Sequence, residues 1–169
     1  GKQGNEQRGW LFSVEEDNTL VLQLFKNSSD KTEAISSSVL QSGQWYHVAM
    51  TYEYVSDGQS KMRLYIDGQN TASVDNAVGP VTANATAFEV GRYHWSSAYS
   101  RCFHGNIDKL RVYTRALTPE EVQVLHGGGN VTDPVPGSPT NLRIQPSGEL
   151  TLSSSSQLYS VRSAGLMWP

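Results

Sequence analysis

Cysteine is almost absent from this chain, and its scarcity excludes two kinds of cross-link. The single thiol among 169 residues belongs to Cys102. One cysteine cannot build an internal disulfide framework, nor can it supply a zinc site made of cysteines. We expect Cys102 to be a small buried side chain, and pairing with a cysteine of another polypeptide is the alternative.

Long apolar runs and an excess of basic residues are missing as well. The uninterrupted apolar stretches are only a few residues long, too short for a membrane span. Thirteen Lys and Arg stand against sixteen Asp and Glu, for a formal net charge of −3. Nucleic-acid binders normally carry a clustered excess of Lys and Arg. We therefore expect neither a nucleic-acid partner nor a membrane span.

Strand periodicity is what the chain has in abundance. Apolar residues alternate with polar ones in most segments, for example in 10–14, 20–25, 46–52 and 61–66. Alternation of this kind is typical of strands with one face in a core and the other in solvent. Clusters of Asn, Asp, Gly and Ser separate the segments. The pattern predicts an all-β sandwich of two antiparallel sheets.

The dipeptide Asp67-Gly68 gives the sharpest local prediction. It lies between two alternating runs, where a type I′ turn needs positive φ at both central residues. We therefore predict a hairpin in which residues 61–66 pair with 69–75.

One short helix is predicted after the last strand of the main alternating region. Thr118 offers a capping hydroxyl, Pro119 suits the first helical position, and Glu120 and Glu121 place acids in the first turn. Gly127 is expected to end the helix in the left-handed conformation. Two turns are too short to stand alone, so the helix must dock on the sheets.

Composition changes after the predicted helix. Residues 127–140 are rich in Gly and Pro and have the character of an inter-domain linker. Residues 141–169 alternate again but are too few for an independent core. The sequence therefore predicts a domain over 1–126, a linker over 127–140, and a tail over 141–169 that is truncated, poorly ordered, or paired with something else.

Three segments carry a resemblance to a known family. Residues 42–52 resemble the G-x-W-x-H-V-A-x-T-Y segment of laminin-G-like domains, and residues 63–68 resemble their L-Y-V-D-G hairpin. Residues 105–118 are similar to their closing strand and helix cap. The chain thus resembles the bacterial type of laminin-G-like domain over about residues 8–126. The resemblance implies a concanavalin A-like jelly roll, a core position for Trp45, and a multidomain extracellular or cell-surface parent protein.

The opening strands of the family are not recognisable in this chain, which resembles the later two-thirds of the domain. Residues 139–142 resemble the start of a fibronectin type III module. In the family the opening strands lie beside the closing one, so residues 105–113 would lack a neighbour. We expect preceding residues of the parent protein or another chain to fill this position. Folding back of 141–169 is the alternative, and a Gly- and Pro-rich linker favours separation instead.

A polar segment rich in aromatic residues is the predicted ligand-binding site. Exposed aromatic rings offer flat faces on which sugars stack, and guanidinium groups bond hydroxyls or carboxylates. The alternative is that the tryptophan folds back over the sheet edge, because large aromatics are more often buried. The candidates for ligand binding are Arg92, Tyr93, Trp95, Tyr99 and Arg101.

Asp108 is the candidate metal ligand. It is in phase with Leu110 and Val112, so we expect it to point into the sandwich, where a carboxylate must be paired, hydrogen-bonded or metal-bound. The family resemblance implies that this residue helps to hold a structural Ca²⁺, and hydrogen bonding to the backbone is the alternative. The four histidines show no metal-binding spacing, and we expect them at the surface or in packing contacts.

Catalytic motifs are not found. The chain has no G-x-S-x-G elbow, H-E-x-x-H helix or P-loop. Glycoside hydrolases with the jelly roll carry an E-x-D-x-x-E strand, and Glu15-Glu16-Asp17 lacks that spacing. We therefore expect a non-catalytic extracellular module that binds carbohydrate. The alternatives are a structural or adhesion module that binds another protein and, third, an accessory domain of a polysaccharide-degrading enzyme.

Overall fold

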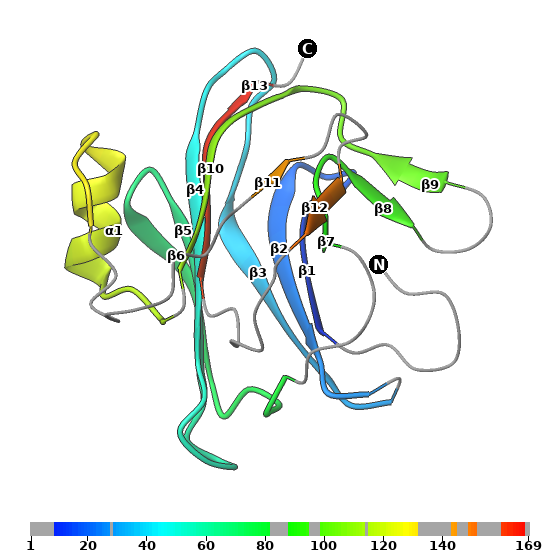
Figure 1. Ribbon diagram of the computed structural model, residues 1–169, viewed down its shortest axis with the longest axis vertical. Helices are drawn as coiled ribbons and strands as arrows, with labels where there is room; N and C mark the ends of the chain where they lie inside the picture. Colours follow the sequence, from blue (N-terminus) through cyan, green and yellow to red (C-terminus); the bar gives the residue numbers. More distant parts are fainter. Residues whose placement is uncertain are drawn as a thin grey trace.

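Alternating apolar residues form the two sheets of a β-sandwich, seen edge-on in the computed structural model of Figure 1. Every paired strand is antiparallel to its neighbour. The predicted all-β sandwich is confirmed. The structure describes residues 9–27, 29–81, 88–94, 99–113, 115–131, 143–144, 149–151 and 160–167.

The first sheet has three strands in sequence order. They are β1 (Gly9–Val14), β2 (Thr19–Phe25) and β3 (Lys31–Val39). Asn18 supplies the positive φ, 63°, that the β1–β2 turn requires. Its carbonyl also accepts the backbone N–H of Leu40 at 2.9 Å, which ties the end of β3 to this turn.

The second sheet has five strands in the order β10-β13-β4-β5-β6. Three of them follow one another along the chain: β4 (His47–Glu53), β5 (Lys61–Ile66) and β6 (Gln69–Asp75). The other two are β10 (Asn106–Tyr113) and β13 (Ser160–Met167).

Two small sheets accompany the sandwich. One joins β7 (Phe88–Glu89), β12 (Glu149–Thr151) and β11 (Arg143–Ile144). The other is the hairpin of β8 (Arg92–His94) and β9 (Tyr99–Cys102).

The main core lies between the two large sheets. The leucines of β2 pack there against alternate residues of β4 and β5, as the period of two predicts. The buried members are Leu20, Leu22, Leu24, Val48, Met50, Tyr52, Met62, Leu64 and Ile66, with Ala34, Leu40 and Ala77. One core therefore holds both sheets together.

The predicted type I′ hairpin is confirmed. Asp67 and Gly68 have φ of 50° and 77°, and β5 pairs with β6 on either side of them. The Asp67 carboxylate accepts the backbone N–H of His47 at 2.8 Å, and the Asp67 N–H donates to the His47 carbonyl at 2.7 Å. The turn is thus bonded to the start of β4 as well.

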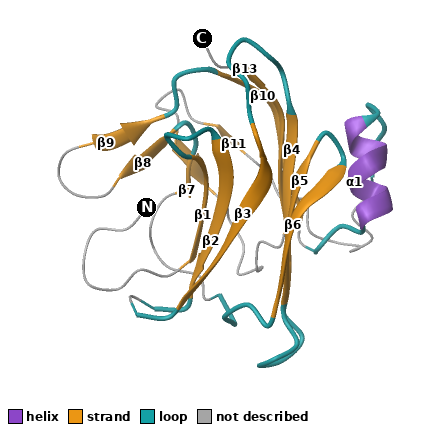
Figure 2. Cartoon of the chain, turned by 180° about the vertical axis from the view of Figure 1, so that it is seen from behind, coloured by secondary structure: helices purple, strands orange, loops and turns teal. Residues whose placement is uncertain are grey.

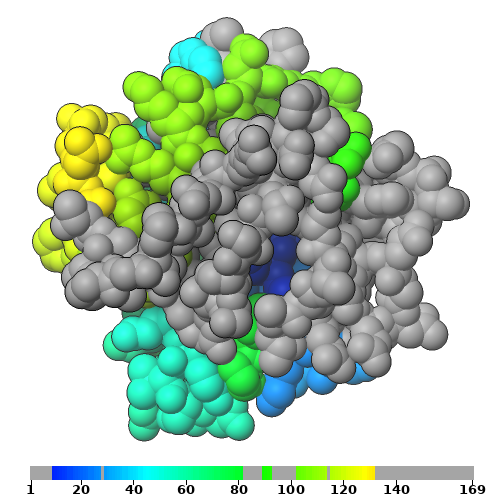
Figure 3. Space-filling view, in the orientation of Figure 1, coloured from blue at the N-terminus to red at the C-terminus, as the bar shows by residue number. Residues whose placement is uncertain are grey.

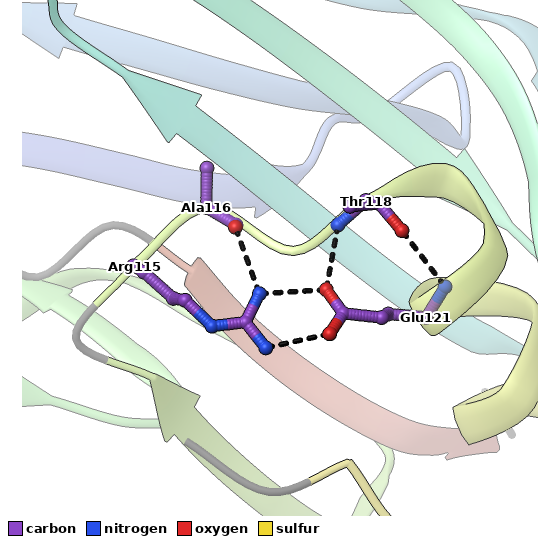
Figure 4. Close-up of polar contacts among 4 residues, drawn as sticks. All are labelled: Arg115, Ala116, Thr118 and Glu121. Carbon is purple, nitrogen blue, oxygen red and sulfur yellow. Dashed lines mark hydrogen bonds and ion pairs between the residues drawn. The ribbon is translucent and has the colours of Figure 1, made fainter. Parts of the chain in front are cut away.

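Helix α1 (Pro119–His126) begins where the sequence predicts. Thr118 and Glu121 form a reciprocal capping box, and Arg115 holds the Glu121 carboxylate through two contacts of 2.6 Å (Figure 4). The guanidinium of Arg115 lowers the pKa of Glu121 through these hydrogen bonds. The predicted left-handed end at Gly127 is wrong: Gly127 has φ of −69°, and Gly128, at 84°, makes that turn.

A second cluster anchors α1 to the outer face of the five-stranded sheet, as Figures 1 and 2 show. Val122 and Leu125 are fully buried there with Ala49, Tyr65, Tyr113 and Leu117. In the space-filling view the helix forms a ridge at the margin of the molecule (Figure 3). No helix in the described residues has the length and apolar character needed to cross a membrane.

The neighbour of the closing strand differs from the expected one. β10 pairs with β13, which in turn pairs with β4. The prediction that preceding residues or another chain fill this position is therefore wrong for this structure. The expected alternative, that residues from 141–169 fold back, is the one seen for β13, which bonds on both of its edges. The division of the chain at 127–140 and the fibronectin-like start stay predictions.

Candidate ligand-binding site

The β8–β9 hairpin collects the residues predicted to bind a ligand. Arg92 and Tyr93 belong to β8, and Tyr99 and Arg101 belong to β9. Part of the segment that was expected to be a loop therefore forms two paired strands. Trp95 lies outside the described residues. In both ribbon views the hairpin projects away from the two large sheets (Figures 1 and 2).

Backbone register brings an aromatic residue and a cation opposite each other. Tyr93 is the register partner of Arg101, and Arg92 is the partner of Cys102. A hydrogen bond of 2.8 Å from the Phe103 N–H to the Gly91 carbonyl continues the ladder at the base of the hairpin. Gly91 has φ of 75°, a conformation that favours glycine and allows the chain to turn into β8.

Arg92 is held at the base of the hairpin by an ion pair. Its Nε lies 3.1 Å from the Glu89 Oε1, and its side chain is 38% exposed while that of Glu89 is 12% exposed. This contact fixes the position of a guanidinium, a group whose planar fork suits carboxylates and hydroxyls.

Cys102, at the end of β9, is exposed. The expectation of a small buried thiol is therefore wrong. The reason is its position at the base of a projecting hairpin, where the sandwich does not cover it.

Asp108 does not point into the sandwich. It is exposed, and its Oδ1 accepts the backbone N–H of Lys109 at 2.8 Å. The pairing of β10 shifts register on both sides of Asp108, and Lys109 has φ of 52°. This irregularity breaks the alternation, so Ile107, Leu110 and Val112 pack against the core while Asp108 turns outward.

Within the described residues, Asp108 belongs to no cluster of His, Cys, Asp and Glu side chains. Calcium requires about six to eight oxygens, whereas no group of three or more His, Cys, Asp or Glu is assembled within that part of the chain. The backbone hydrogen bond of Asp108 matches the alternative reading. Calcium binding by Asp108 stays a prediction.

Two histidine rings lie close together where the end of α1 docks on the sheet. The rings of His47, at the start of β4, and His126, at the end of α1, are 5.6 Å apart at a tilt of 45°. His47 is buried and His126 is exposed. The contact is one of packing, as expected from the sequence for these two residues.

Trp45 is a candidate that sequence analysis missed, because the family resemblance placed it in the core. Its side chain is 49% exposed. The alternation itself could have shown this: Trp45 is in phase with His47 and Ala49, on the face away from the main core, and not with Val48 or Met50.

The loop that carries Trp45 is fixed by side-chain hydrogen bonds. The Tyr46 hydroxyl accepts the Gln41 N–H and donates to the Gln44 Oε1, both at 3.1 Å, and the Gln44 amide donates to Gln41 at 3.0 Å. Tyr46 and Phe103 also line a shallow hollow with Val14 and Leu40. The loop thus presents amides and an exposed indole together.

The acidic turn before β2 has a structural role. The Asp17 carboxylate accepts the Thr19 hydroxyl at 2.6 Å and the Thr19 N–H at 3.0 Å, and the first of these bonds is the main cause of its lowered pKa. Glu15 accepts the Ser13 hydroxyl at 2.8 Å. These bonds account for both carboxylates as parts of the turn.

Sequence comparison decides the family. The profile of the concanavalin A-like lectin/glucanases superfamily, in its laminin-G form, matches residues 1–123. This chain belongs to that superfamily. The predicted resemblance is confirmed. Because the superfamily includes both lectins and glucanases, membership establishes the fold and leaves the activity to the site.

No curated protein sequence matches the chain. One solved structure is similar to it: residues 221–444 of an S-layer domain-containing protein from Clostridium thermocellum. The TM-score is 0.43 and the identity is 24%, with 72% of this chain and 63% of that chain covered. The laminin-G-like chain thus spans less than two thirds of that protein's resolved length.

Proposed function

We propose that this laminin-G-like chain is a non-catalytic module that binds extracellular or cell-surface carbohydrate. The observation that supports the proposal is the projecting β8–β9 hairpin, which gathers four of the five candidate residues on two paired strands. An extracellular location is part of the proposal, and surface labelling of cells that carry the parent protein tests it.

The composition of the hairpin suits sugar recognition. Directly opposed residues of an antiparallel pair have their Cα atoms about 4.5–5.5 Å apart, so Tyr93 and Arg101 are anchored close together. An aromatic ring offers an apolar face to the C–H groups of a sugar, and a guanidinium donates to its hydroxyls or carboxylates. Neither role requires a deep pocket.

A glycan array with the whole chain tests the proposal. We expect binding to at least one glycan class, and a loss of affinity of at least about tenfold, or about 1.4 kcal/mol, in Trp95→Ala and Arg101→Ala. Trp45→Ala is the matched control, because it removes an exposed indole at another site. A folded chain that binds no glycan contradicts the function; loss only in Trp45→Ala moves the site to the β3–β4 loop.

A second function, a structural module for protein assembly, is favoured by one observation. The strand β13, which lies between β10 and β4 in the five-stranded sheet, is outside the residues that match the family. Native mass separates the two functions: a monomer that binds glycan supports the first, and an obligate assembly without glycan binding supports the second. Hydrolysis of a polysaccharide by the chain alone would overturn the non-catalytic assignment.

Calcium binding at Asp108 is proposed separately, on the family resemblance. A ligand that binds only the folded state at about 100 times its Kd stabilises that state by about 2.7 kcal/mol. We therefore expect Ca²⁺ to raise the melting temperature, and Asp108→Asn to remove the increase. Identical melting curves with Ca²⁺ and with chelator would reject the site.

A further inference from the structure

The five-stranded sheet is completed by a strand from outside the laminin-G-like segment. The family match ends at residue 123, whereas β13 spans Ser160–Met167. β13 lies between β10 and β4 and is antiparallel to both. Within the family-matched segment, β4 and β10 are therefore separated by a position one strand wide, which we call the strand slot.

β13 bonds to the strand slot along both edges. On one side its register runs from Asn106↔Met167 to Tyr113↔Ser160, and on the other from Ser160↔Thr51 to Ala164↔His47. An empty slot would leave rows of backbone N–H and C=O groups on β4 and β10 without ladder partners. What the slot recognises is thus mainly an extended backbone of about eight residues, as in β-strand addition.

The tether of β13 is long. About 28 residues separate Val131 from Ser160, and among them β11 and β12 pair with each other and with β7. Once β12 releases β7, the tether spans up to about 90 Å when extended. β13 can therefore reach the strand slot of a neighbouring molecule as well as that of its own chain.

We propose that the strand slot is an acceptor site that takes β13 either from its own chain or from a second copy. Reciprocal exchange gives a closed two-fold dimer in which every ladder hydrogen bond is rebuilt with the same register. A tether of this kind gives its own strand an effective concentration in the millimolar range. The monomer therefore dominates in dilute solution, and the exchanged dimer forms where copies are concentrated or held side by side.

A cross-strand disulfide distinguishes the two arrangements in the full chain. Thr51 and Ser160 are register partners, at a separation that a disulfide can bridge. In a Cys102→Ser background, Thr51→Cys with Ser160→Cys should form an internal disulfide after refolding at about 10 μM. After refolding near 1 mM, the concentration at which exchange competes with the tether, covalent dimers should rise at least about tenfold.

The matched control is Glu53→Cys with Lys61→Cys in the same background. These residues are register partners on β4 and β5, which are consecutive strands of the chain. Because a short connection joins them, their disulfide should stay internal at every concentration. A Thr51–Ser160 disulfide that also stays internal near 1 mM, or that does not form at all, would overturn the proposal.

A mixing experiment tests strand exchange with variants that cannot form the internal disulfide. Molecules with Thr51→Cys alone are unfolded and refolded with molecules that carry Ser160→Cys alone, both with Cys102→Ser. Neither can form the internal bond, and strand exchange pairs position 51 only with position 160, so it gives a covalent heterodimer, identified by its mass, in excess of the two homodimers that random oxidation also produces. We expect this excess near 1 mM. Its absence, when the double variant shows the internal disulfide, would restrict β13 to its own chain.

Discussion

The two sheets of the sandwich are assembled in different ways. In the three-stranded sheet every neighbour is the next strand along the chain. In the five-stranded sheet only β4, β5 and β6 are joined in that way, while β13 reaches its place between β10 and β4 from the far end of the sequence. The difference teaches that a turn specifies the pairing of two consecutive strands. A strand from far along the chain pairs instead where a strand edge has unpaired backbone N–H and C=O groups.

The sheets also differ in what lies on their outer faces. α1 covers part of the five-stranded sheet, and Leu125 of the helix and Tyr65 of β5 are both buried where the two meet. In the three-stranded sheet, Ile35 and Val39 of β3 are 52% and 58% exposed. The five-stranded sheet thus has a second apolar cluster on its outer face, formed with the side chains of the short helix α1.

The largest expected effect tests whether both sheets depend on one core. Leu22 of β2 and Leu64 of β5 are each fully buried in it. Leu22→Ala and Leu64→Ala should each lower the free energy of unfolding by about 2–5 kcal/mol, because each leaves a cavity. Denaturant titration followed by circular dichroism measures this loss. Separate transitions for the two sheets would contradict a shared core.

A proline in β13 tests whether this strand, which is distant in sequence, contributes to the stability of the sheet. Ser163 is the register partner of Val48 on β4. Ser163→Pro removes a backbone donor from an interior strand and should cost about 1–3 kcal/mol, the cost of leaving a buried polar group unpaired. Ser163→Ala, which keeps the donor, should cost less than about 1 kcal/mol. Equal stability of the two variants, measured by urea unfolding, would show that β13 contributes nothing to the sheet.

Substitutions at two glycines compare a turn that packs against α1 with a turn that contacts no other element. Gly58 and Gly68 have φ of 79° and 77°, but only at Gly68 would an added Cβ meet another element, 3.3 Å from the Cβ of His126. Gly58→Ala should cost about 1 kcal/mol from backbone strain. Gly68→Ala should cost more, because α1 has to shift. Thermal melts measure both, and equal losses would mean that the helix is not packed on this turn.

The smallest effect concerns the cap of α1. Loss of the Arg115–Glu121 contact in Glu121→Gln should cost about 1 kcal/mol, the usual value for a helix cap. The folded state lowers the pKa of Glu121. The stability that the ionised Glu121 carboxylate contributes is therefore present above the unfolded pKa of about 4.3, and it is lost as the pH falls through the folded pKa.

The matched control for this cap is Glu120→Gln, an exposed acid of the same first turn. Unfolding curves collected between pH 7 and pH 3 should show the gap between Glu121→Gln and the unmodified chain close at low pH. A gap that is constant with pH would assign the loss to packing instead of charge.

Sequence analysis succeeded where the information is local. Asp67-Gly68 specified its hairpin because two residues with positive φ have few alternatives, and Thr118-Pro119 specified the start of α1 because the orphan N–H groups need a cap. Of the candidate site, the residue types were predictable, while the pairing of Tyr93 with Arg101 was not. That pairing depends on where the hairpin turns.

The failure at Asp108 has a physical cause, which is contact between segments far apart in the chain. Alternation assigned Asp108 to the interior, but the register shifts of β10 against β13 expose it. Trp45 is a different kind of failure: the family resemblance assigned it to the core, whereas its phase with Ala49 places it on the face away from the main core, where its side chain is 49% exposed.

The sequence by itself determined the strands, the hairpin, the helix start and the family, because each depends on residues a few positions apart. Only the tertiary structure decided which strand fills the slot between β4 and β10. The entropy of closing a loop rises slowly with its length, by about 0.6 kcal/mol per doubling. Distance along the chain therefore hardly discriminates between partners, and the unpaired backbone of β4 and β10 accepts the strand that can bond to both.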